Sequence, residues 1–99
     1  MREFPPAQVS VGDTTSAGTV QLTATSSGAF GVLVRPVSAN TGGVYVIVNN
    51  GQPTHAIAIL GTYIDPLNLE GVFVACTDPT TVWFASTTAS TKVNISIIA

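Results

Sequence analysis

Short apolar runs with an alternating pattern, separated by turn residues, are the feature that most limits what this chain can fold into. Residues 19–25 alternate polar and apolar side chains, and residues 92–97 do the same. A period of two places alternate side chains on opposite faces of a β-strand. Further runs rich in Val, Ile and aromatic residues cover 31–37, 44–48, 56–60, 72–76 and 82–86. About seven short strands at this spacing predict an all-β fold, a single compact β-sandwich or a jelly-roll-like barrel.

Turn residues lie between these runs. Asn50-Gly51 follows the run at 44–48, and Asn-Gly is a strong signal for a tight turn. Pro36 cannot donate a backbone hydrogen bond, so we expect the strand at 31–37 to lie at a sheet edge or to carry a bulge.

The 99 residues are enough for one domain, and we divide them into two parts. Residues 1–18 contain Pro5-Pro6 and many small polar residues, which predicts an extended N-terminal arm. Residues 19–99 would form the β-domain. Phe4, Val9 and Val11 give the arm apolar side chains to bury, so we expect it to serve assembly more than folding; the alternative is a frayed terminus.

Charged residues make up only 8% of the chain, against roughly 25% in an ordinary soluble domain. Catalysis by proton or phosphoryl transfer needs ionisable groups held close together, so this composition argues against an enzyme. Three Lys and Arg residues are too few for a phosphate-binding patch, which argues against nucleic acid as a partner. No apolar run approaches the ~18 residues of a membrane span, and the first ten residues lack the apolar core of a signal peptide. We therefore expect synthesis in a cytoplasm.

The residues that could carry chemistry are few, and each has a simpler structural interpretation. His55 has no acidic or thiol neighbour in sequence, so we interpret it as a solvated or core histidine; a shared metal site on a symmetry axis is the alternative. Cys76 ends an apolar run and is predicted to be an inert thiol. The carboxylates are interpreted as turn-capping groups rather than as a catalytic pair or a calcium site: Asp13, Asp65, Glu70 and Asp78. We predict no catalytic, cofactor-binding or metal-binding residues.

Three of the expected strands, 44–48, 72–76 and 82–84, are apolar on both faces. A two-layer sandwich buries only one face of each sheet, so the second face should meet another subunit. The candidate interface residues are Phe4, Val9, Val11, Tyr45, Ile47, Phe73 and Trp83. As an alternative, four aromatic residues could form a platform that stacks on sugars: Tyr45, Tyr63, Phe73 and Trp83.

Residues 31–42 followed by Val44-Tyr45-Val46 give an expected strand, an Asn-Thr-Gly turn and a second strand, and residues 82–86 give a late strand. This pattern resembles that of small virion proteins of tailed bacteriophages. Residues 65–70 lack the Pro-Gly-Glu order of the family's middle loop, and Ile47 stands where the family has Gly. The resemblance implies a capsid decoration (cement) protein or another head or tail accessory subunit, often trimeric, that binds the capsid lattice from outside.

Together these observations lead to the hypothesis of a non-enzymatic structural protein on the exterior of a phage capsid. It would form a homotrimer, bind the major capsid protein and stabilise the shell without a cofactor. A carbohydrate-binding or adhesin module is the alternative from another class, and a tail or connector subunit of the virion is a third possibility.

Overall fold

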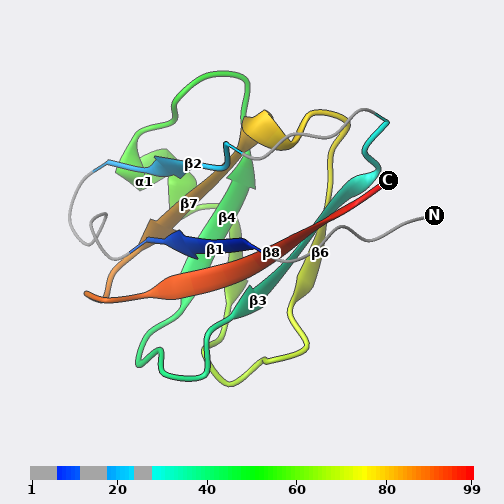
Figure 1. Cartoon of the computed structure of the whole chain (residues 1–99). Coiled ribbons are helices and arrows are strands. Elements are labelled where there is room, and N and C mark those ends of the chain that lie inside the picture. The colour runs from blue at the N-terminus through cyan, green and yellow to red at the C-terminus, as the bar shows by residue number, and fades with distance from the viewer. Residues whose placement is uncertain (1–6, 12–17, 24–27) are drawn as a thin grey trace.

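The computed structural model describes residues 7–11, 18–23 and 28–99, and this part of the chain folds into two antiparallel sheets of four strands each (Figure 1). The strands are β1 (Ala7–Ser10), β2 (Val20–Gln21), β3 (Gly31–Pro36), β4 (Val44–Val48), β5 (Thr62–Ile64), β6 (Val72–Ala75), β7 (Val82–Ser86) and β8 (Lys92–Ile98). A short helix, α1 (His55–Ala58), precedes β5, and a 3-10 turn, η2 (Pro79–Thr81), precedes β7. The prediction of an all-β sandwich is confirmed.

The order of the strands is that of a jelly roll. The first sheet has the order β1-β8-β3-β6 and the second has the order β2-β7-β4-β5. Thus β1 pairs with β8, β2 with β7, β3 with β6 and β4 with β5, all antiparallel. The chain therefore behaves as one long hairpin that is rolled up so that its two arms form two facing sheets.

The core lies between the two sheets and is built from the inward half of each alternating strand. On β3, Val32 and Val34 are buried, whereas Leu33 and Arg35 on the other face are partly exposed. Phe84 of β7 is the largest fully buried side chain in the described part of the chain. Truncating a buried Phe costs about 3–5 kcal/mol, so this residue alone carries a large share of the stability of a small domain.

The apolar run at 56–60, expected to be a strand, is instead helix α1 and the turn after it. Thr54 caps the helix, because its Oγ1 accepts a hydrogen bond from the backbone N–H of Ile57 at 3.3 Å. Ala58 is fully buried, and α1 contacts β7 and β4 of the second sheet. A strand that was not expected, β5, follows the helix and pairs with β4.

Pro36 does not mark an edge strand. β3 lies between β8 and β6, inside the first sheet. Pro36 is the last residue of β3 and lies beyond Val34, the last residue that pairs with β6. The missing N–H of Pro36 therefore lies at the end of β3, where β6 no longer pairs with it.

Part of the expected N-terminal arm belongs to the sandwich. Residues 7–10 form β1, where Val9 pairs with Val93 of β8. The N–H of Val11 donates to the carbonyl of Thr91 at 2.8 Å, and the Val11 side chain is fully buried in the core. The boundary at residue 18 is thereby corrected, since residues 7–11 are part of the β-domain. Phe4 lies outside the described residues.

Candidate interaction surfaces

The outer face of the second sheet brings together three of the predicted interface residues. The register of β4 and β7 places Ile47 beside Trp83 and Tyr45 beside Ala85. Trp83 is only 7% exposed, and its Nε1–H donates to the carbonyl of Asn49 at 3.1 Å. Because α1 contacts β7 and β4, the chain itself covers part of this apolar face.

This packing corrects two of the interface assignments. Trp83 and Val11 are buried within a single chain, so in the folded subunit neither presents a surface to a partner. Val9 is partly buried against the core. Tyr45 and Ile47 are partly buried, and Phe73 is the one among the described interface candidates that is more than half exposed, at 51%.

The four aromatic residues considered as a sugar-stacking platform do not share one surface. Trp83 is buried, and Phe73 lies on β6 of the other sheet. Tyr45 and Tyr63 do contact each other, with ring centroids 5.1 Å apart and planes tilted by 51°. The Tyr63 ring covers Gly43, at which a Cβ atom would collide with it. What remains of the platform is this tilted pair, with Tyr63 half exposed.

Large apolar side chains are exposed at several other places. Ile57 lies on α1 and Leu60 follows it, with Leu60 78% exposed. Leu67 and Leu69 are exposed in the loop between β5 and β6. Phe30 precedes β3 and is also exposed. Sequence reasoning missed Leu60 because it placed the residue in a strand; Pro53-Thr54 before the run and Gly61 after it were the available signals for a capped helix.

The strand β6 forms one edge of the first sheet. Phe73 and Ala75 are exposed on its outer face, and the Phe73 ring lies over Gly31 of β3, where a side chain would collide with it. Val72, Val74 and Cys76 point inward and are only partly buried, as expected at the open end of a sandwich.

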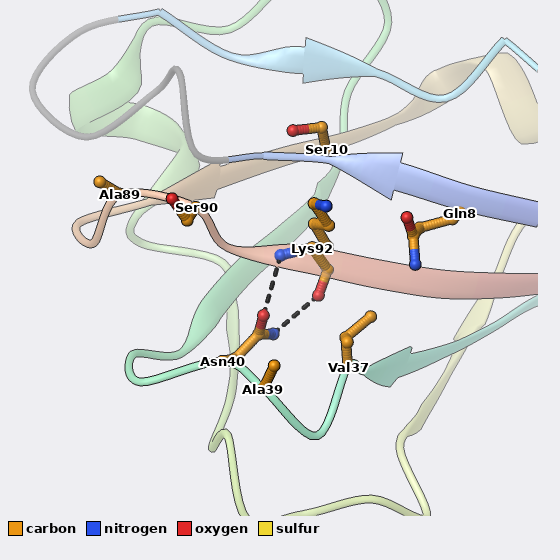
Figure 2. A pocket seen from close by; sticks show the side chains of 8 residues that line it. All are labelled: Gln8, Ser10, Val37, Ala39, Asn40, Ala89, Ser90 and Lys92. Carbon is orange, nitrogen blue, oxygen red and sulfur yellow. Dashed lines mark hydrogen bonds between the residues drawn. The ribbon is translucent and has the colours of Figure 1, made fainter.

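A shallow hollow with a mixed polar and apolar lining lies on the outer side of β1 and β8, shown in Figure 2. Asn40 closes one side, because its Oδ1 accepts from the N–H of Lys92 at 3.0 Å and its Nδ2 donates to the carbonyl of Lys92 at 2.7 Å. Gln8, Ser10 and Ser90 supply further polar side chains. The Asn40 side chain therefore pairs with the backbone of β8 just beyond the end of β3, as another strand residue would. This gives the Asn-Thr-Gly turn a structural role.

Two of the carboxylates cap turns, as predicted. Oδ1 of Asp65 accepts from the N–H of Leu67 at 2.8 Å. Oδ1 of Asp78 accepts from the hydroxyl of Thr80 at 2.7 Å and from its N–H at 3.0 Å. These two hydrogen bonds lower the pKa of Asp78. Burial, and secondarily the Asp78 carboxylate, raise the pKa of the Cys76 thiol, which keeps it protonated and weakly nucleophilic.

The remaining candidate, His55, opens α1 with its Nδ1 3.3 Å from the carbonyl oxygen of Gly18. Within residues 7–11, 18–23 and 28–99, no three His, Cys, Asp or Glu side chains come together in a way that could hold a metal ion. Over the same ranges, no helix has the length and apolarity needed to cross a bilayer.

Comparison of the chain with protein-family models, curated proteins and solved structures gave no match. The resemblance to phage virion proteins therefore depends on the residues quoted for it above. The candidate sites depend on the geometry of this chain alone.

Proposed function

We propose that this chain is a non-enzymatic structural subunit of a phage-type virion, which binds the outer surface of the capsid and stabilises the shell. The observation that carries the proposal is the amount of apolar surface that the folded subunit leaves exposed. Among the residues that the structure describes, eight large apolar side chains are exposed. They are Phe30, Val48, Ile57, Leu60, Tyr63, Leu67, Leu69 and Phe73.

Burying such side chains against another protein gives a favourable free energy of about 25 cal/mol per Å² of apolar surface. The low charge of the chain keeps the cost of removing water from its surfaces small. A subunit that binds the assembled shell and not its unassembled components stabilises the assembled state by mass action. The partner would be the major capsid protein, and the subunit would act on the virion exterior after synthesis in the host cytoplasm.

The jelly-roll order of the strands is compatible with this role, because jelly rolls occur in viral capsid domains. They also occur in lectins, so the fold by itself assigns no function. A sugar-binding module is the second candidate, and Tyr63 is the observation that favours it. Under that alternative, Tyr63→Ala would abolish binding on an array of bacterial surface glycans.

The experiment that tests the proposal is a binding assay on capsids. Phage particles from the host that produces the chain are purified, the chain is quantified by mass spectrometry, and capsids lacking it are incubated with purified protein. We expect binding at a fixed ratio to the major capsid protein and a higher melting temperature of the shell. Leu60→Ser and Leu67→Ser change exposed side chains, so they should weaken binding without unfolding the subunit; Thr23→Ser, at another exposed site, is the matched control.

Absence of the chain from purified particles, or its failure to bind capsids, would contradict the proposal. The homotrimer implied by the resemblance is tested separately, by the mass of the purified protein in solution. A mass of three chains supports the trimer, and a different mass overturns it.

A further inference from the structure

We propose that the edge of β6 with which no described strand pairs joins the same edge of a second copy of the chain, so that two first sheets form one continuous antiparallel sheet. The inference concerns self-association in solution and does not depend on the virion role. It is an alternative to the homotrimer that the resemblance implies, and the mass in solution decides between the two. It follows from the direction of the backbone hydrogen bonds in β6, from the composition of the edge and from its register.

The pairing of β3 with β6 shows which backbone groups of β6 point away from β3. The N–H of Cys76 donates to the carbonyl of Phe30 at 3.2 Å, just beyond the pair Gly31–Ala75. In an antiparallel ladder, hydrogen-bonded pairs alternate with pairs that are not hydrogen-bonded. Val74 and Val72 therefore bond to β3, whereas Phe73 and Ala75 direct their N–H and C=O groups away from it.

Among the described elements, only β3 pairs with β6. Residues 72–76 contain no charge and no proline, which are the features that usually protect an edge strand from pairing with another chain. Phe73 and Ala75 are both exposed, so the outward backbone groups are accessible from the side. Such an edge is a template for an added strand.

A second copy fits this edge because the outward backbone groups of residues 72–76 can pair with the same groups of another chain in an antiparallel register. Residues with outward backbone groups must face one another, which allows Phe73 of one chain to lie opposite either Phe73 or Ala75 of the other. We choose the pairing of Phe73 with Ala75, because it uses both outward residues of both chains and places a large side chain beside a small one. Each of these two pairs exchanges both N–H···O bonds, and the large Phe73 ring lies beside the small Ala75. Val74 then lies directly opposite Val74 of the second copy, on the two-fold axis.

The two carboxylates nearest to the edge lie beyond its ends. Glu70 precedes β6 and Asp78 follows it, and both are exposed. The proposed register brings Glu70 of one chain toward Asp78 of the other. Repulsion between them is screened by ions, so we expect added salt to strengthen the dimer.

The register can be tested by cross-linking through single cysteines. Val74→Cys in a Cys76→Ser background places two thiols on a pair that is not hydrogen-bonded, with Cα atoms about 4.5 Å apart, inside the range of a disulfide. Ala75→Cys in the same background is the matched control, because its two copies are diagonal neighbours about 7–8 Å apart. We expect mild oxidation to give a covalent dimer with the first variant and not with the second.

The mass of the purified protein gives an independent test. We expect light scattering to show a concentration-dependent dimer, twice the 10.1 kDa of one chain. Ala75→Pro removes an outward N–H that the single subunit does not use, so it should halve the mass and leave the circular dichroism of the sandwich intact.

Four outcomes would overturn the proposal: a wild-type mass of one chain at every concentration, a trimer, a dimer that Ala75→Pro leaves unchanged, or equal cross-linking of the two cysteine variants. If Ala75→Pro does not fold, the comparison of the Val74→Cys and Ala75→Cys variants decides whether the proposal holds. A protein that stays monomeric yet binds capsids would retain the proposed function and refute the edge pairing.

Discussion

Replacing Val11 with Ala tests whether the N-terminal segment is part of the folded domain. The Val11 side chain is fully buried in the core between the two sheets, and its N–H donates to the carbonyl of Thr91, the residue before β8. Removing the two methyl groups forfeits about 1.6 kcal/mol of transfer free energy, and the cavity adds to this. We therefore expect the free energy of unfolding to fall by about 2 kcal/mol, or roughly 8–16 °C in melting temperature for a domain of this size.

The assay is urea unfolding followed by the fluorescence of the buried Trp83, with thermal melts by circular dichroism. Val48→Ala is the matched control, because Val48 is 44% exposed at the end of β4 and should change the stability by about 0.5 kcal/mol or less. Equal stabilities of Val11→Ala and the wild type would refute the reasoning. The whole segment 1–18 would then act as an arm outside the core, as first expected from the sequence.

Three further predictions concern single side chains. Asn40→Ala removes both hydrogen bonds to the backbone of Lys92 and should lower the free energy of unfolding by about 1–2 kcal/mol in urea titrations; an unchanged midpoint would contradict the strand-continuation role. The hydrogen bonds from Thr80 lower the pKa of Asp78 in the folded state. The stability that Asp78 contributes to the fold is therefore present above the ordinary carboxyl pKa and is lost as the pH falls below about 4. Asp78→Asn should therefore weaken the dependence of the free energy of unfolding on pH in this acid range. The same pH dependence in the variant and the wild type would exclude Asp78 as its source. Burial and Asp78 raise the pKa of Cys76, so a disulfide reagent at neutral pH should react more slowly with the native protein than with the urea-unfolded chain; equal rates would show that the fold does not protect the thiol.

The strands that were predicted most accurately are those in which local pattern and tertiary pairing agree. Residues 44–48 and 82–86 coincide with β4 and β7, because their Val, Ile and aromatic content favours strands and both lie inside the second sheet. The run at 56–60 was predicted wrongly, since five apolar residues fit a strand as well as a helix turn. The cap at Thr54 decides between them, together with the packing of α1 on β7 and β4.

The candidate surfaces were harder to predict, because exposure depends on segments far apart in the chain. Trp83 and Phe73 both lie in runs that are apolar on two faces. Trp83 is buried by packing within the chain on the side where α1 lies. Phe73 stays exposed on β6, an edge strand with no described neighbour on its outer side. Val11 was assigned to the N-terminal arm because the pairing of β1 with β8 joins residues more than eighty positions apart. The local sequence around Val11 gives no sign of this pairing.

The rolled-hairpin order of the strands has a consequence for how the protein folds during synthesis. β8 lies in the middle of the first sheet, between β1 and β3, although it is the last strand along the chain. A ribosome therefore releases β1 and β3 long before their common neighbour exists, and both must wait with unpaired edges until residues 92–98 emerge. Pairings between such distant segments form slowly, and waiting strands are prone to aggregation. We expect nascent chains arrested before residue 92 to require a chaperone to stay soluble, and the sandwich to close only after β8 has left the exit tunnel.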